Sequence, residues 1–560
     1  MSTPNIPGAK RAGLPVDLTR LGSEGDDWLS PEERYALKTH GVCAQAQPHV
    51  FMIRTRTGGV VSSQAARGLA RLAEDYGRGW IHLTTRQQIE IHHVEATNVP
   101  TVLAGVTNLG LTTRSACGHT MRGVMSCPEA GVGIEEPFDC SWDARAATAS
   151  ILARAPAIDT KMPQRVNIQF GGCTPCREHA KTNEMGFVSV VQGETLGYEL
   201  WLGGSLGKSQ PTLARKAVDF LPRRDVLPAV HALFDVHMKH SDFDQPGKGR
   251  LKFLIRRIGW DAFLELFFEA FEEARNLPWP EPPAVSPPLS ASIAEILACA
   301  PEGGWGSGVR PQRIPGWAMV TVNVPLGELD GGDMRVLADL ADDLGDERLY
   351  PTRNQNVMFR HVALRNVSVL RRTLAGLGLG LEGADQSRDV RVCTGGPVCT
   401  LAITPAQTVG ARLIENPALL RNSGLRVSIS GCPNACAQHQ IADVGLSGGK
   451  VTIDGVSMLG YQVWLGGDLG KDRMGRVVGR VAEADVVSIT EAIVGVWEAL
   501  RERGETLSDT VNRIGVAGFD AQIGAVFRGR WAPGPEPEEG GLEERDPRNT
   551  RRLPLVGVTS

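Results

Sequence analysis

The sequence predicts an α+β fold that is internally duplicated, and three observations support this fold class. Cysteine-bearing loops occur around Cys173 and again around Cys432, and each is followed by a similar strand, "GYELWLGGSLGK" or "GYQVWLGGDLGK". A helix and a TRQ or TRNQ turn precede each loop, and the letter match sets Arg86 opposite Arg353. The matched blocks keep the same order, and their period is near half the chain, which is too long for a stack of short repeats.

Each half starts with a small unit of strand, helix and strand. The expected first strands are "HVFMIRTRT" and "WAMVTVNVP". The expected helices, "SSQAARGLARLAEDYG" and "DMRVLADLADDLG", carry apolar residues at helical spacing. The second part of each half carries the cysteine loop, a strand and a helical end, "WDAFLELFFEAFEEAR" or "ITEAIVGVWEALRERG".

A proline-rich segment separates the halves, since six prolines lie between Pro278 and Pro288. The last residues are rich in Pro, Gly and charge, which is typical of a disordered tail. We therefore expect small units at 35–110 and 305–385, larger units at 111–277 and 386–527, a linker at 278–300 and a tail at 530–560.

Composition narrows the class of function. The 560 residues carry a net charge of -4, which argues against a nucleic-acid partner. No apolar run approaches the roughly 18 residues of a membrane span, and the first residues lack the apolar core of a signal peptide. We expect a cytoplasmic protein with no membrane partner. Most of the 11 cysteines are grouped, and in a reducing compartment such groups favour metal binding or catalysis.

The second half places four cysteines in glycine-rich loops, "VCTGGPVCTLAI" and "GCPNACAQHQ". They are Cys393, Cys399, Cys432 and Cys436. Structural zinc sites use gaps of two to four residues, which the first pair exceeds, whereas iron–sulfur clusters accept looser spacings. The spacing favours an iron–sulfur cluster, with zinc or unrelated buried cysteines as alternatives.

This pair of motifs resembles the signature of the nitrite and sulfite reductase hemoprotein family. The resemblance covers residues 35 to 525 and implies a pseudo-two-fold assembly of ferredoxin-like half-domains and siroheme-type domains. It implies that the four cysteines bind a [4Fe–4S] cluster and that Cys436 also ligates the siroheme iron. The first large domain is expected to carry no cluster.

The resemblance also assigns roles to basic residues. Siroheme is rich in carboxylates and the substrates are small anions, and arginine suits both because its guanidinium is bidentate and always charged. The implied cofactor contacts are Arg54, Arg56, Arg86, Arg122, Arg165 and Cys436. The implied catalytic residues are Arg86, Arg122, Arg165 and Asn167.

The implied activity is an assimilatory six-electron reduction of nitrite to ammonia or of sulfite to sulfide. No dinucleotide or flavin motif is visible, so the electrons are expected from ferredoxin or another external donor. Asn167 stands where sulfite-type members tend to have lysine and nitrite-type members asparagine, which favours nitrite slightly. The alternatives are a cobalamin-pathway precorrin oxygenase and a non-catalytic iron–sulfur protein.

Arg165 and Cys43 mark two further departures from the family pattern, and one more group of cysteines needs an interpretation. Arg165 replaces a usual lysine, and Cys43 stands in a segment that usually offers an aromatic residue, where it could contact Cys117. Cys173 and Cys176 could hold a second metal with Cys127. Because the first half lacks a C-x5-C motif, we interpret them instead as a counterpart of the cluster loop that holds no cluster.

Overall fold

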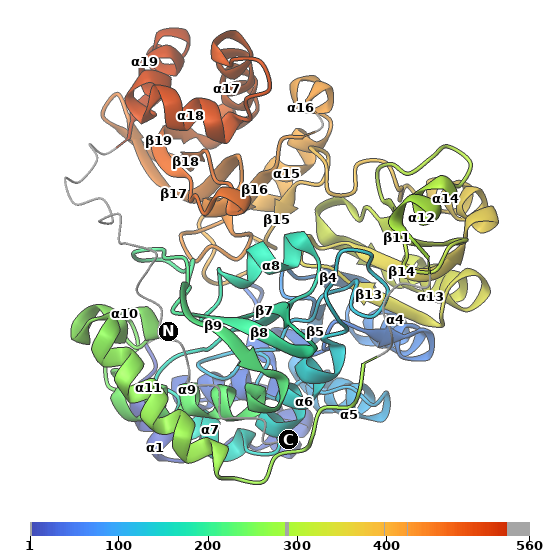
Figure 1. Cartoon of the computed structure of the whole chain (residues 1–560). Helices are drawn as coiled ribbons and strands as arrows, with labels where there is room; N and C mark the ends of the chain where they lie inside the picture. Colours follow the sequence, from blue (N-terminus) through green and yellow to red (C-terminus); the bar gives the residue numbers. More distant parts are fainter. Residues whose placement is uncertain (1–2, 286–290, 397, 423, 535–560) are drawn as a thin grey trace.

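The computed structural model describes residues 3–285, 291–396, 398–422 and 424–534. Its elements form two small domains and two large domains (Figure 1). Each half of the chain contributes one domain of each kind, which confirms the duplicated α+β fold.

The two small domains complete each other's sheets. The first sheet has the order β1-β2-β5-β4-β12 and the second the order β10-β11-β14-β13-β3, so each ends in a strand from the other half. The strands of the first half are β1 (Val42–Ala44), β2 (Val50–Thr55), β3 (Val61–Ser62), β4 (Trp80–Leu83) and β5 (Ile89–Glu95). Those of the second half are β10 (Val309–Pro311), β11 (Trp317–Val322), β12 (Glu328–Asp330), β13 (Arg348–Pro351) and β14 (Val357–Ala363).

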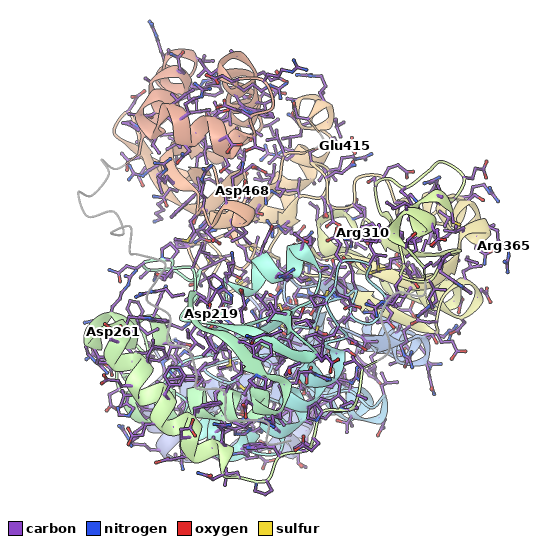
Figure 2. The ribbon with its side chains drawn as sticks, in the orientation of Figure 1. Asp219, Asp261, Arg310, Arg365, Glu415 and Asp468 are labelled. Carbon is purple, nitrogen blue, oxygen red and sulfur yellow. The ribbon has the colours of Figure 1, made fainter. Side chains whose placement is uncertain are left out.

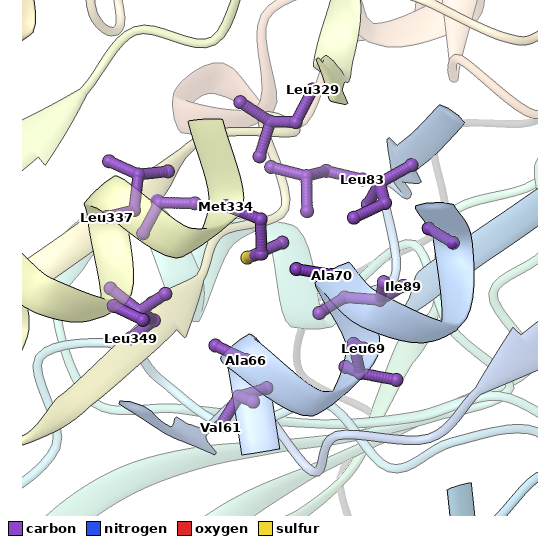
Figure 3. Packing of buried hydrophobic residues seen from close by; sticks show 14 of the residues in the cluster. Val61, Ala66, Leu69, Ala70, Leu83, Ile89, Leu329, Met334, Leu337 and Leu349 are labelled. Atoms are coloured by element: carbon purple, nitrogen blue, oxygen red, sulfur yellow. The ribbon is translucent and has the colours of Figure 1, made fainter. Parts of the chain in front are cut away.

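One hydrophobic core spans both small domains. It lies under α4 (Ser63–Tyr76) and α13 (Gly331–Leu344), which pack against each other. Leu69 and Leu83 from the first half lie close to Met334 and Leu337 from the second (Figure 3). Each helix begins at a side-chain cap, which stabilises its first turn. The shorter helices of these domains are α5 (Val99–Asn108) and α14 (Val367–Ala375).

Two equivalent glutamines lock the small domains to the large ones. Gln87 has φ 57° and donates to the Ser126 carbonyl at 2.9 Å, while Gln355 has φ 66° and donates to the Val392 carbonyl at 2.8 Å. When Gln87 is aligned with Gln355, the alignment of the two turns differs by one residue from the alignment based on sequence similarity. Arg86 is therefore equivalent to Asn354, and the pairing with Arg353 expected from the sequence is wrong.

The two large domains share one strand order. Their sheets run β6-β7-β8-β9 and β15-β16-β17-β18-β19-β20, with β6 parallel to β7 and β16 parallel to both β15 and β17. The first sheet consists of β6 (Ile168–Gly171), β7 (Met185–Gln192), β8 (Thr195–Leu202) and β9 (Arg215–Pro222). The second consists of β15 (Arg391–Val392), β16 (Val427–Ser430), β17 (Val444–Ile453), β18 (Val456–Leu465), β19 (Arg476–Ala482) and β20 (Trp531–Pro533).

Helices follow the last matched strand of each large domain in the same order. In the first domain they are α9 (Val226–His240), α10 (Leu251–Ile258) and α11 (Trp260–Arg275), and in the second α17 (Val486–Leu500), α18 (Leu507–Ile514) and α19 (Val516–Val526). The other helices are α6 (Ser141–Leu152), α7 (Ala155–Lys161), α8 (Thr174–Ala180), α15 (Ala406–Ile414) and α16 (Pro417–Arg421).

Three boundaries differ from the sequence prediction. Helices α1 (Ile6–Arg11), α2 (Leu18–Glu24) and α3 (Pro31–Leu37) precede the first small domain, where no element was predicted. The predicted linker contains α12 (Ile293–Ala298), which a capping box between Ser292 and Glu295 starts, while residues 286–290 lie outside the described residues.

The tail predicted from residue 530 is wrong for its first residues. They form β20 because Trp531 packs over Gly479, where a Cβ would lie 1.9 Å from the indole ring. The rest of that prediction, from residue 535, lies outside the described residues.

Candidate active site at the cysteine loops

Two adjacent parallel strands bring the four predicted cysteines of the second half to one sheet edge. Cys393 follows β15 and Cys432 follows β16, and the carboxyl ends of parallel strands lie at the same edge. Cys399 lies further along the first loop, where it forms a bridge with Gln45 of the first half. The neighbouring Ala46 N–H donates to the Val398 carbonyl at 2.8 Å, so the first small domain holds this loop in place.

The loops leave no room for side chains at two glycines. Gly395 has φ +59°, and a Cβ there would lie 2.8 Å from the Ala406 nitrogen. A Cβ on Gly431 would lie 2.9 Å from the Thr404 carbonyl oxygen. The close approach lets the Gly431 N–H donate to Cys393 Sγ at 3.1 Å.

The donor set of these loops fits a metal cluster. Burial raises the pKa of the Cys432 thiol to about 11, and burial also raises the pKa values of Cys393 and Cys399. Thiols with raised pKa values stay protonated near neutral pH unless a metal displaces the proton. Backbone N–H groups point at the sulfurs of all three residues and would stabilise the bound thiolates.

Cys436 is exposed, whereas the other three cysteines are buried or half-buried. The preceding Ala435 has φ 59°, a left-handed conformation that turns the chain outward. The Thr85 hydroxyl donates to the Cys436 carbonyl at 2.8 Å. This bond anchors the TRQ turn of the first half on the cysteine loop and places Arg86 beside it.

Among the residues that the structure describes, no carboxylate accepts a hydrogen bond from the guanidinium groups of Arg86 and Arg122. Arg86 donates one bond to the Gly123 carbonyl at 3.2 Å, and Arg122 donates one to the Ala116 carbonyl at 2.6 Å. The Nε atom of each is buried without a hydrogen-bond partner. Burial, together with the charge of Arg122, lowers the pKa of Arg86 to about 9. A buried cation without a carboxylate partner is stabilised when an anion binds beside it.

Arg165 and Asn167 lie on the other side of the same region. Burial and the charge of Arg250 lower the pKa of Arg165 to about 9, and the charges of Arg122 and Cys436 also act on it. Asn167 is buried with its Oδ1 unpartnered. Together with Arg86 and Arg122, these residues form one basic region next to Cys436.

Arg54 and Arg56 are bonded to the protein itself. Arg54 Nε donates to the Glu90 carboxylate at 2.7 Å, which neutralises its charge locally. Arg56 is 4% exposed, and its Nη atoms donate to carbonyls of the 114–122 loop, including that of Met121 at 2.9 Å. Both side chains therefore brace the segment that carries Arg122.

Sequence reasoning missed the buried pair of Glu184 and Arg250. Arg250 Nε donates to Glu184 at 2.8 Å, and the same carboxylate accepts the Asn167 N–H at 2.9 Å. The signal was an acid at the start of the apolar strand "EMGFVSVV", since a fully buried acid needs a partner. The sequence did suggest the contact between Cys43 and Cys117, whose thiols are hydrogen-bonded.

Among the described residues, no helix combines the length and apolar character that crossing a membrane requires.

Taken together, the four cysteines and the partly unpartnered guanidiniums fit a metal cluster next to a polyanionic group. This fit rests on chemical donors, glycine-enforced close packing and unsatisfied buried atoms.

Two family models match the chain. "Nitrite and sulphite reductase 4Fe-4S domain" matches residues 117–274 and 383–529, more than half of the chain. "Nitrite/Sulfite reductase ferredoxin-like half domain" matches residues 44–109 and 310–377. Each model matches once in each half, which agrees with the duplicated architecture.

Whole proteins give the same picture. The chain is 28% identical to ferredoxin–nitrite reductase of Synechococcus elongatus, over 83% of this chain and 90% of that protein. It is 28% identical to sulfite reductase [ferredoxin] 2 of Mycolicibacterium paratuberculosis, over 75% and 74%. The solved structure of Mycobacterium tuberculosis NirA protein shares the fold, with a TM-score of 0.80 at 24% identity over 93% of this chain and 98% of that one. These matches do not favour the precorrin oxygenase or the non-catalytic alternative.

Proposed function

Because this chain belongs to the nitrite and sulfite reductase family, we propose that it is a ferredoxin-dependent assimilatory reductase of a small oxyanion, with nitrite preferred over sulfite. As a member of the family it is an oxidoreductase with siroheme and a [4Fe–4S] cluster as cofactors. The two reductases of Synechococcus elongatus and Mycolicibacterium paratuberculosis are named for ferredoxin, which supports an external donor for this chain.

In this proposal Cys393, Cys399, Cys432 and Cys436 hold the cluster. Cys436, the exposed member of the four, would be the residue that also contacts the siroheme. When bound, the two cofactors would relay, one at a time, the six electrons that the external donor supplies for the reduction. The residues of the chain hold both groups and the anion in fixed positions.

The basic region carries the proposal. Arg86, Arg122 and Arg165 bind the anion through guanidinium N–H groups that have no carboxylate hydrogen-bond partner in the described part of the chain. These donors are preorganised, so little reorganisation is needed when charge develops on the substrate. Arg54 and Arg56 brace the cofactor side by holding the 114–122 loop.

The preference for nitrite rests on residue 167. Sulfite is a dianion near neutral pH and nitrite a monoanion, so the dianion gains more from each extra cation. Asn167 is neutral, and the nearby Arg250 is already paired with Glu184. Within the part of the chain that the structure describes, the basic region therefore offers three guanidiniums without a carboxylate hydrogen-bond partner, and residue 167 adds no fourth cation.

The test is a comparison of both anions with one preparation of the holoenzyme. Reduced ferredoxin, and reduced viologen as an artificial donor, are supplied with nitrite or sulfite, and ammonia and sulfide are measured. We expect turnover with both donors and a higher kcat/KM for nitrite. Turnover of neither anion would refute the reductase, and a higher kcat/KM for sulfite would refute the preference.

A further inference from the structure

We propose that the first half binds one zinc ion through Cys127, Cys173 and Cys176. The sulfur atoms of these three buried residues all lie within 4.8 Å of one another. The triad lies in the large domain that the sequence predicted to hold no cluster. The inference rests on these residues and does not depend on the proposed function.

The triad is built by the same architecture as the cluster loops. A parallel bridge joins Met125 to Gln169 in the first half, as β15 joins β16 in the second. Cys127 is thereby equivalent to Cys393, and Cys173, which follows β6, is equivalent to Cys432. Cys176 lies in the first turn of α8. The thiols therefore meet because the fold brings two sheet-edge loops together, although Cys127 and Cys173 are 46 residues apart.

Thiol spacing selects a single ion over a cluster. Zinc binds four ligands tetrahedrally at about 2.3 Å from sulfur, which places sulfurs about 3.8 Å apart. Cys127 Sγ and Cys173 Sγ lie 3.4 Å apart, close to that value. Among the described residues, no three of the four cysteines of the second half form such a compact group. Thiolates that bind separate corners of an iron–sulfur cube must stand further apart.

Charges around the triad fit a divalent cation. Arg353 Nη1 donates to Cys176 Sγ at 3.3 Å, a contact that suits a thiolate. Three thiolates are balanced by one Zn²⁺ and this one guanidinium. Glu129, whose carboxylate faces Cys173, is already paired with Arg310 at 2.6 Å. Arg310, labelled in Figure 2, comes from β10 of the second half.

The carboxylate of Glu136 is a buried hydrogen-bond acceptor near the three thiols. Glu136 has a fully buried side chain whose Oε1 accepts from Arg313 at 3.2 Å, while its Oε2 has no hydrogen-bond partner among the described residues. A Cβ placed on Gly172 would lie 3.2 Å from Glu136 Oε2 and 3.6 Å from the Cys127 Cβ. Glu136 is not in the compact group itself, and in this proposal its Oε2 would accept a hydrogen bond from a water molecule that fills the fourth position on zinc.

One residue of the triad borders a cavity. Cys127 lies in the lining of a cavity of about 550 Å³ to which the first large domain and both small domains contribute. Its lining includes Arg145, Asp346 and Arg360. In this proposal a metal ion approaches the triad from the side of Cys127.

Metal analysis of the holoenzyme tests the proposal without any substitution. We expect about one zinc per chain in addition to the iron, and sulfur neighbours at about 2.3 Å in X-ray absorption at the zinc edge. This readout is independent of enzymatic activity and of iron. A wild-type protein that holds no zinc after incubation with zinc salt, or zinc surrounded only by nitrogen and oxygen, would overturn the proposal.

Matched variants add a second test. Cys127→Ser and Cys173→Ser should lower bound zinc by at least about 10-fold, since each removes one of three thiolates, and should retain iron. Cys140→Ser is the control because Cys140 is a buried cysteine of the same core outside the triad. Zinc that persists in both triad variants, or that falls equally in Cys140→Ser, would contradict the assignment.

Discussion

The two cysteine loops occupy equivalent places in the two large domains, yet they arrange their thiols differently. In the first half a two-residue gap lets α8 begin at once, and the thiols of Cys173 and Cys176 converge on Cys127. In the second half the gap is three residues, and the left-handed Ala435 turns Cys436 outward. A left-handed alanine costs about 1–2 kcal/mol. The second loop thus differs from the first by one added residue and by this conformational cost. As a result Cys436 is exposed, whereas Cys173 and Cys176 lie buried against Cys127.

The largest expected effect on activity and cofactor content comes from replacing Cys436, the exposed cysteine of the second loop. Cys436→Ser should lose the cluster and siroheme together and reduce activity to background, because one sulfur serves both groups. Iron content and the absorption spectrum measure this. Cys173→Ser is the first-half control and should keep both centres. Loss of the cluster from Cys173→Ser would mean that the two loops are not functionally distinct.

The next effect concerns the basic region, which faces only the outward loop. Arg86→Ala or Arg122→Ala should lower kcat/KM about 10²-fold, the scale for one preorganised charge partner, and leave cofactor content unchanged. Steady-state assays of the holoenzyme measure it. Arg365→Ala is the control because Arg365, labelled in Figure 2, is exposed and precedes α14 of the second small domain, outside the basic region. Wild-type kinetics in both site variants would remove these arginines from the site.

A smaller effect should follow from Asn167→Lys. The added cation should raise the ratio of kcat/KM for sulfite to that for nitrite by about 10-fold, because the dianion gains more from it. Both anions are assayed with the same preparation. An unchanged or lower ratio would show that residue 167 does not face the anion.

The smallest effect tests a position where the halves differ in charge. Asp389 occupies the place that Gly123 has in the first half, and burial with the neighbouring Asp385 charge raises its pKa from 3.8 to about 7. Folding therefore favours the protonated acid, and its contribution to stability falls as pH rises from about 4 to 7. Asp389→Asn should raise the Tm at pH 8 by about 2 °C and have no such effect at pH 4.

Thermal unfolding at the two pH values measures this difference. The Asn356 amide and the Asp385 N–H both donate to Asp389 Oδ2, and the asparagine oxygen can accept both bonds. The variant thus removes a charge and keeps the contacts. An equal Tm change at pH 4 and pH 8 would show that Asp389 does not titrate in this range.

The sequence predicted those features of the molecule that depend on short, contiguous stretches of residues. Four cysteines in glycine-rich loops, two amphipathic helices and the repeated order of blocks identified the family and the duplicated fold. Local patterns also misled: the shared letters of the two turns aligned Arg86 with Arg353, whereas the backbone conformations of Gln87 and Gln355 set a register one residue away.

What the sequence left out depends on contacts between distant segments. Strands β3 and β12 are two and three residues long, too short to carry a periodic pattern. The Glu184–Arg250 pair joins residues 66 apart, and the sulfur triad depends on a bridge between Met125 and Gln169. Spacing along the chain identified the thiols, but only the folded sheets determine how far apart they lie.

The exchanged strands also have a consequence for biosynthesis. The outer edge of β4 pairs only with β12, which the ribosome makes much later than β4. At about 5–20 residues per second, the nascent first half waits for some tens of seconds with a bare strand edge and an uncovered face on α4. Unpaired edges of this kind recruit other chains. Yield of active protein should therefore depend on chaperones that shield the nascent chain until the second half emerges.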